Sequence, residues 1–171
     1  MMDSKQNLWF SGWNAFIYKY NTITYKKEVY DVFNKKDKSE NQINRRKALC
    51  FMEDKRGTIW IGVLYSGLSY YDEQNNTIRC ISADNKIPYS LHYDYYVSAL
   101  CSDNEGNILV GTDKGISIFN PSFQQFNSID ENNVTNPFPK TEVTQLFEES
   151  SGDILAATWE ADGCCMTKIS G

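Results

Sequence analysis

Short apolar runs, separated by turns that contain an acid and usually a glycine, recur four times along this chain. When residues 3–12, 103–112 and 149–158 are aligned with residues 54–63 on Trp60, the anchor positions are Trp9, Trp60, Leu109 and Leu155. The anchors lie about 50 residues apart, a period typical of stacked structural repeats. An acid precedes every anchor by six residues, at Asp3, Asp54, Asp103 and Glu149. The chain is therefore predicted to be a repeat protein.

Each repeat reads as four short strands. A strand such as residues 97–101 leads into a D-x-x-G turn, where glycine supplies a positive φ. The next strand, residues 59–63 in the second repeat, is apolar on both faces and is expected to be buried between neighbouring sheets. A G-L-x-x-Y-D strand follows, and the fourth strand is the most polar, as an outer edge should be. Four strands with this period predict β-propeller blades.

The predicted fold class is all-β, built of propeller blades of four antiparallel strands each. The blades are expected at approximately 1–33, 47–82, 96–130 and 142–171, the first without its innermost strand and the last without its outermost strand. This is about half of a seven-bladed ring. A compact ring of four blades is the alternative arrangement.

The repeat D-x-x-G-x-[IL]-W-[IV]-G-x-x-x-x-G-[LI]-x-x-[YF]-[DN] resembles the two-component regulator propeller repeat family. The second repeat matches it at Asp54, Gly57, Trp60, Gly62, Gly67, Leu68, Tyr71 and Asp72, and the third at Asp103, Gly106, Gly111, Gly115, Ile116, Phe119 and Asn120. The end repeats depart from it at Gln6, Ser11, Ala157 and Cys164. The resemblance implies a periplasmic or otherwise extracytoplasmic sensor region of a bacterial hybrid two-component histidine kinase, with the kinase itself absent from this sequence.

A partial ring predicts a partner. Open blade faces are apolar, and soluble proteins rarely leave such faces uncovered. Either a second copy, giving a homo-oligomer such as a dimer, or the remainder of a propeller is expected to cover them. Two copies would supply twenty-eight strands, enough for seven four-stranded blades.

Charge and composition narrow the functional classes. The formal charge of -5 argues against nucleic-acid binding, which needs a basic surface. The sequence has no apolar run long enough to span a membrane, so this segment is expected to make no membrane contact. It has no signal-peptide pattern at its start, so the chain is expected to be either cytoplasmic or a piece of a longer protein. The single histidine, His92, and five cysteines without a C-x-x-C pair predict no metal and no cofactor. Acids that recur in every repeat fit turns better than catalysis, and no catalytic residue is expected.

Loops between the second and third strands are the natural place for a ligand, because they carry no packing role. These are residues 11–14, 63–67, 112–115 and 158–163. Aromatic side chains there could stack on a sugar ring, and polar ones could bond its hydroxyl groups; the alternative is that the aromatic residues only cap the core. The predicted ligand-binding residues are Trp13, Tyr65, Asp113, Lys114, Trp159, Glu160 and Asp162, with Tyr93, Asp94, Tyr95 and Arg45 in second rank.

Three functions remain open at this point. The first is a non-catalytic ligand-sensing propeller fragment that recognises a glycan or its breakdown product. The second is a propeller enzyme such as a polysaccharide lyase or glycosidase. The third is a propeller that binds other proteins. An enzyme should concentrate acids or a histidine in the loops of one blade, and the sequence shows no such cluster.

Overall fold

The computed structural model describes residues 1–13, 16–31, 47–81, 91, 96–122, 125–129, 138, 141–160 and 163–169. Fourteen strands form in these residues. They are β1 (Asn7–Ser11), β2 (Phe16–Asn21), β3 (Lys27–Asp31), β4 (Ala48–Glu53), β5 (Ile59–Val63), β6 (Gly67–Asp72), β7 (Thr77–Ile81), β8 (Val97–Ser102), β9 (Ile108–Thr112), β10 (Gly115–Asn120), β11 (Gln125–Ile129), β12 (Glu142–Glu148), β13 (Ile154–Glu160) and β14 (Gly163–Ile169). The described part of the chain has no helix that is long and apolar enough to cross a membrane.

The strands form four antiparallel sheets. Sheet I is β1-β2-β3, sheet II is β4-β5-β6-β7, sheet III is β8-β9-β10-β11 and sheet IV is β12-β13-β14. The all-β fold of four-stranded antiparallel blades is thus confirmed, with the two end sheets one strand short. The sheets lie within the four expected ranges, although the exact limits of the repeats stay a prediction.

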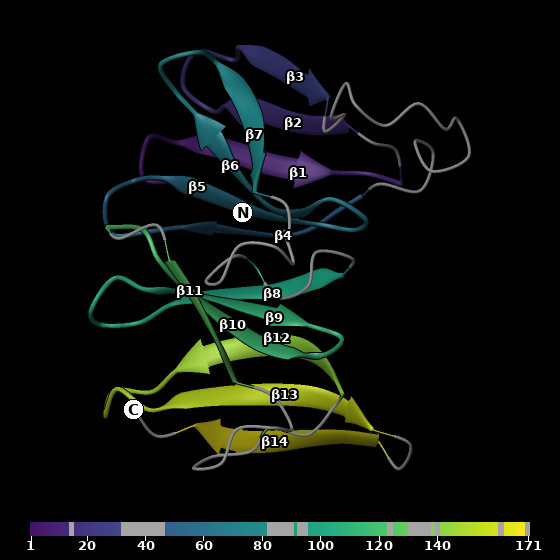
Figure 1. Ribbon diagram of the computed structural model, residues 1–171. Helices are drawn as coiled ribbons and strands as arrows, with labels where there is room; N and C mark the ends of the chain where they lie inside the picture. The colour runs from purple at the N-terminus through teal and green to yellow at the C-terminus, as the bar shows by residue number, and fades with distance from the viewer. Residues whose placement is uncertain are drawn as a thin grey trace.

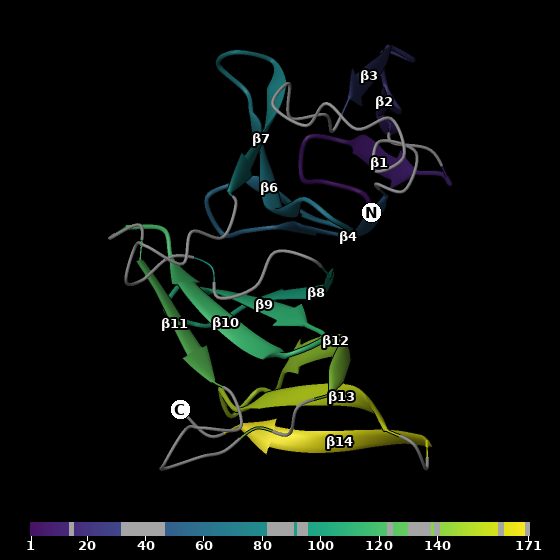
Figure 2. The same cartoon turned by 45° about the vertical axis from the view of Figure 1, so that its right-hand side comes forward.

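The sheets stack in chain order from sheet I to sheet IV, and these two lie at opposite ends of the stack (Figure 1, Figure 2). The alternative of a compact four-bladed ring is therefore wrong, because such a ring needs sheet I to meet sheet IV. At the inner edge of sheet I, the Trp9 N–H donates to the Met1 carbonyl oxygen at 2.8 Å and the Met1 amino group donates to the Trp9 carbonyl oxygen at 2.9 Å. Met1 thus occupies the place where β4 pairs with β5 in sheet II.

Burial along the strands follows the predicted pattern. Every residue of β5 and of β9 is buried, because each strand has a neighbouring sheet on both faces. The fourth strand of sheet II, β7, has no buried residue. The expectation of a doubly buried second strand and a polar outer strand is confirmed.

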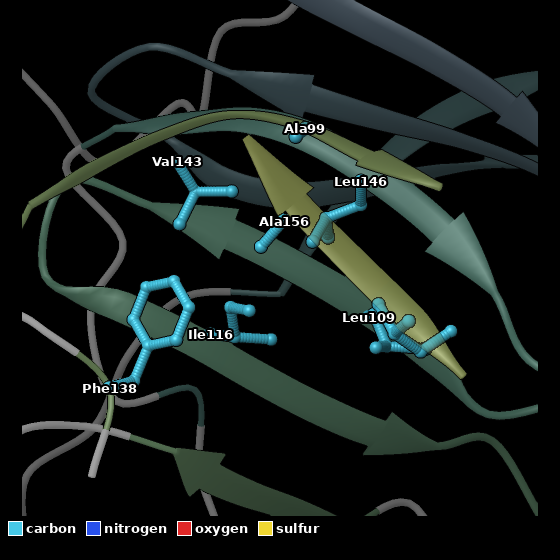
Figure 3. Close-up of a cluster of buried hydrophobic side chains, with 8 residues drawn as sticks. Ala99, Leu109, Ile116, Phe138, Val143, Leu146 and Ala156 are labelled. Atoms are coloured by element: carbon cyan, nitrogen blue, oxygen red, sulfur yellow. The ribbon is translucent and has the colours of Figure 1, made fainter. Parts of the chain in front are cut away.

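Three apolar cores hold the stack together, one between each pair of neighbouring sheets. Between sheets I and II, Trp9, Ile17 and Tyr30 contact Ile59 and Ile61. Between sheets II and III, the core includes Trp60, Leu68, Ile108, Val110 and Phe119. Between sheets III and IV, it includes Ala99, Leu109, Ile116, Phe138, Val143, Leu146 and Ala156 (Figure 3). The core is thus a series of inter-sheet layers.

The recurring aspartates close the turns and bind the anchor tryptophans. One oxygen of Asp54 accepts the backbone N–H groups of Arg56 and Thr58, both at 2.9 Å, and the other accepts the indole N–H of Trp60 at 2.9 Å. Asp3 accepts the indole N–H of Trp9 in the same way, at 2.7 Å. The acid at this position therefore stabilises a turn and orients the large side chain between two sheets.

Two glycines are required by close contact between sheets. A Cβ on Gly62 would lie 2.6 Å from the Val97 carbonyl oxygen, and one on Gly111 would lie 2.7 Å from the Val143 Cγ1 atom. The first strand of the next sheet passes directly over each of these positions. Glycine in the repeat motif is thus a packing requirement on the second strand.

Candidate functional site

The loops that follow the second strands lie at one end of the stack. The strands β1, β9 and β13 all end on the right-hand side of Figure 1, and the aspartate turns lie at the opposite end. We call this right-hand end the loop end. Trp13, Tyr65, Asp113 and Lys114 lie in these loops, as expected.

In sheet IV, the expectation of a loop over residues 158–163 is wrong. The hairpin ladder continues through the pairs Trp159–Cys164 and Glu160–Gly163, so Trp159 and Glu160 belong to β13. Asp162 and the second-rank residues Tyr93, Asp94, Tyr95 and Arg45 lie outside the described residues, as does the side chain of Glu160. The roles assigned to all these residues stay predictions.

Trp13 is connected to the loop of sheet II through Lys47. The Lys47 ammonium lies 3.7 Å from the centroid of the Trp13 ring, a cation–π contact. The Lys47 carbonyl oxygen accepts the N–H of Leu64 at 2.9 Å. Trp13 is 87% exposed, so its ring has a large area available to a ligand. Lys47 thereby brings the loops of sheets I and II together.

Tyr65 has the backbone conformation of a glycine. Its φ is 61°, in the left-handed region that costs an L-residue roughly 1–2 kcal/mol. Residues held in such conformations cluster at binding and switch sites, which agrees with the prediction that Tyr65 is a ligand-binding residue. The side chain is half-buried, so part of the ring is available to a ligand.

A group of acids and a tyrosine joins sheets III and IV at the loop end. Burial raises the pKa of the Asp113 carboxyl, and the neighbouring charge of Glu142 raises this pKa further. Its Oδ1 atom is buried and has no hydrogen-bond partner. Burial, together with a hydrogen bond to Glu142, also raises the pKa of Tyr96. The structure thus brings Tyr96, Asp113 and Glu142 into one electrostatically coupled group, which we call the acid cluster.

Trp159 lies beside Glu142, one member of the acid cluster. Glu142, the first residue of β12, is the register partner of Trp159 in the antiparallel pair β12–β13. Trp159 is 64% exposed, whereas its neighbour Thr158 is buried, so the tryptophan is on the face that points away from sheet III. The arrangement offers a flat aromatic surface next to carboxylate acceptors. Groups of this kind bind polar ring compounds by stacking and by accepting hydrogen bonds from hydroxyl groups.

Sequence reasoning missed Lys47, Tyr96 and Glu142. Each lies at or next to the start of the first strand of a sheet, a position with no recurring chemical type. The loop end therefore holds two groups, one around Trp13 and Lys47 on sheets I and II, and the other around Trp159 and the acid cluster. Lys114 donates its backbone N–H to the Thr112 hydroxyl at 3.1 Å, which shapes the turn between the two groups.

Two cavities between sheets do not involve the predicted residues. One of about 340 Å³ lies between sheets I and II at the aspartate-turn end, against Trp9, Lys19 and Tyr71. Two of its lysines are paired with carboxylates, Lys5 with Glu73 at 2.7 Å and Lys19 with Glu28 at 3.5 Å. The other, also of about 340 Å³, is lined mainly by aromatic side chains between sheets II and III, including Trp60 and Phe119. Among the described residues, no group of three His, Cys, Asp or Glu side chains could hold a metal ion.

No family model matches the chain, and no curated protein matches it either. Solved structures do match over nearly its whole length. The extracellular domain of the putative hybrid two component system BT3049 from B. thetaiotaomicron superposes with a TM-score of 0.78 at 16% identity, over 99% of this chain and 22% of that one. The extracellular domain of BT4673 from the same organism gives a TM-score of 0.70 at 20% identity, over 97% and 20%.

Enzymes with this fold also match. Virginiamycin B lyase from Staphylococcus aureus gives a TM-score of 0.65 at 12% identity, over 99% of this chain and 54% of the lyase. The chain spans about a fifth of the length of these two extracellular domains. At these identities the comparisons establish the fold, which is the propeller-type fold of those extracellular domains over nearly the whole chain.

Proposed function

We propose that this chain is a ligand-sensing propeller segment of an extracytoplasmic receptor, and that it signals to a kinase that this sequence does not contain. Its ligand is a glycan or a glycan breakdown product, bound at the loop end. The observation that carries the proposal is the exposed ring of Trp159 beside Glu142, its register partner, whose carboxylate is in turn electrostatically coupled to Asp113. The likeness to the extracellular domains of two-component systems supports the receptor context.

Recognition follows from the chemistry of the two groups. The Trp159 ring stacks on the apolar face of a sugar, and the acid cluster accepts hydrogen bonds from its hydroxyl groups. Asp113 suits this role because its buried Oδ1 atom lacks a partner, and a ligand hydroxyl would offset that cost. Trp13, Tyr65 and Lys114 extend the surface toward sheets I and II, where a longer oligosaccharide would lie.

Calorimetric titration with a panel of neutral and acidic oligosaccharides tests the proposal. The variants Trp159→Ala and Asp113→Asn should each weaken binding by roughly tenfold or more, because a stacking or charged hydrogen-bond contact contributes about 1–3 kcal/mol. Tyr25→Ala is the matched control, since Tyr25 is a 74% exposed aromatic residue in the turn between β2 and β3. Equal affinity for all four proteins, or no binding across the panel, would contradict a sugar site at the loop end.

A catalytic propeller is the second candidate, and the acid cluster favours it. A carboxyl whose pKa is raised next to a second carboxylate is a common arrangement in acid–base catalysis. Oligosaccharides incubated with the protein would then be cleaved, and chromatography would detect the products. Intact oligosaccharides together with saturable binding heat would favour the sensor. Hydrolytic or lyase-type cleavage of the oligosaccharides that Asp113→Asn abolishes would favour the enzyme.

A further inference from the structure

Both end faces of the stack expose large apolar side chains. On the face of sheet IV that points away from sheet III, Phe147 is 60% exposed and Met166 is 68% exposed. On the face of sheet I that points away from sheet II, Phe10 is 41% exposed and Val29 is 51% exposed. The Phe10 ring stacks on Tyr18 with centroids 5.1 Å apart, which makes an aromatic surface on this face. Exposed apolar surface of this kind marks a site of association.

The sheet IV face carries apolar residues at positions that pack between sheets inside the chain. By the repeat, Phe147 corresponds to Cys101, and Met166 corresponds to Ile118. Cys101 and Ile118 pack into the core between sheets III and IV. The open face of sheet IV is therefore equipped to receive a further sheet.

The sheet I face is the opposite half of the same kind of interface. Phe10 corresponds to Ile61, which is fully buried between sheets I and II, and Leu8 corresponds to the buried Ile59. The interior interfaces join two types of face. The first type carries the anchor residue, such as Trp60 or Leu109, and it packs against the second type, on the next sheet, which carries Ile108 opposite Trp60 and Ile154 opposite Leu109. Sheet IV presents the first type of face at its end of the stack, and sheet I presents the second type at the other end (Figure 1, Figure 2).

We propose that a second copy of this chain covers these faces, with sheet IV of one copy stacked head to tail on sheet I of the other. Continuity with the interior interfaces carries this choice, because one chain supplies both complementary halves. A face-to-face pairing of two sheet IV surfaces would join like faces, an arrangement that no interface inside the chain uses. Two head-to-tail contacts close a two-fold symmetric ring of eight sheets, within the range of four to eight blades that propellers adopt.

The number of sheets differs from the sequence-based expectation of seven blades. That expectation grouped twenty-eight strands into sets of four. In the structure, sheets I and IV are separate three-stranded sheets at opposite ends, so two copies stacked unchanged bring eight sheets together. Trp159 lies on this same open face of sheet IV, at its loop end, so the second copy would border the proposed ligand site. The mass of the wild-type chain tests the association in the absence of any ligand.

Light scattering coupled to size-exclusion chromatography tests the proposal on the whole chain over a wide concentration series. The wild-type chain should have twice the mass of one chain. Phe147→Glu and Phe10→Glu should each yield the mass of one chain, with dimerisation weakened on the order of a hundredfold because a charge becomes buried without a partner. Both residues are on open faces within one copy, Phe10 at 41% and Phe147 at 60% exposure, so the fold of the copy should tolerate the change. Ile23→Glu is the control, because Ile23 is 68% exposed in the turn between β2 and β3 and should leave the dimer intact.

Mixing the two variants separates head-to-tail from face-to-face contact. A Phe147→Glu chain keeps its sheet I face, and a Phe10→Glu chain keeps its sheet IV face, so an equimolar mixture should regain one intact interface and form a dimer. A monomeric wild-type protein would overturn the proposal. So would a dimer that only one of the two variants disrupts, a mixture that stays monomeric, or wild-type growth into larger assemblies that do not close.

Discussion

The contact between Asp54 and the Trp60 indole gives a sharp test of how the repeat stabilises the fold. The proposed change is Asp54→Asn, which keeps the shape of the side chain. If the amide oxygen replaces Oδ1, it still accepts the N–H groups of Arg56 and Thr58, which are 2.9 Å away. The amide nitrogen then faces the indole N–H, which in the wild-type protein donates to Oδ2 at 2.9 Å.

The magnitude follows from burial. Asp54 is 6% exposed and Trp60 is 4% exposed, so water cannot replace the lost partner. Two buried donors that face each other should cost about 2 kcal/mol of the free energy of unfolding, and two backbone hydrogen bonds that lose a charged acceptor should cost about 0.5–1 kcal/mol more. Trp60→Phe removes the indole donor. In that background Asp54→Asn should cost only the smaller amount, which leaves a coupling energy of about 1–2 kcal/mol.

Urea unfolding at neutral pH, followed by far-ultraviolet circular dichroism, measures the four free energies of this double-mutant cycle at one protein concentration. A fixed concentration is needed because association changes apparent stability. The reasoning would be refuted if Asp54→Asn cost the same in both backgrounds. The stability of the turn would then be independent of the buried tryptophan.

The structure predicts three further results. Burial would raise the pKa of Asp54, but the hydrogen bonds that it accepts from Trp60, Thr58 and Arg56 outweigh burial and lower the pKa below 3.8. The stability that this carboxylate contributes should therefore be present above pH 3.8 and be lost as the pH falls through the lower pKa of the folded state. Acid titration of the free energy of unfolding should show a smaller loss for Asp54→Asn than for the wild-type protein. In urea unfolding, Gly111→Ala should destabilise the protein by about 1–3 kcal/mol because the added methyl group would collide with Val143. Gly106→Ala should cost roughly 1 kcal/mol, from backbone strain alone, because Gly106 has a φ of 85° and open space around it. Equal costs for the two variants would contradict the packing argument. Burial raises the pKa of the Cys50 thiol to about 12, so this thiol should not react with iodoacetamide in the native protein at neutral pH. Peptide-level mass spectrometry should find Cys50 unmodified in the native protein and modified after unfolding. Rapid modification of the native protein would show that the packing around Cys50 opens.

Much of the fold could be predicted because each structural requirement is repeated. The tight contact over the second strand recurs at Gly62 and Gly111, and the turn acid recurs at Asp3, Asp54 and Asp103. Each recurrence reinforces the same interpretation, so four sheets and a doubly buried second strand could be expected from sequence. The departures were also informative. Leu109 replaces tryptophan in the third repeat, and there Asp103 instead binds the side chain of Asn107, at 2.7 Å.

The candidate site was less predictable because its residues meet across sheets. Lys47 reaches Trp13 from the start of the next sheet, and Glu142 reaches the region of Asp113 in the same way. Nothing in the spacing of residues along the chain reports such a contact, since it depends on where the loops point. The position of Trp159 in a strand was missed for a related reason. Whether a hairpin ladder extends by two pairs is decided by strand pairing, and the glycine spacing used to align the repeats does not report it.

The repeat itself separates structural from functional positions. The residue four places after the anchor lies at the loop end in every sheet, and it is Trp13, Leu64, Asp113 and Trp159 in turn. The residue six places before the anchor is always an acid, because every turn needs one. This repeat position holds an exposed tryptophan, a leucine, an aspartate and a second tryptophan in the four sheets. It therefore has no common structural requirement to satisfy. Variation at a place that recurs at the same end of every sheet is what a surface shaped for a ligand should show, so substitutions at these four positions should change binding more than they change the free energy of unfolding.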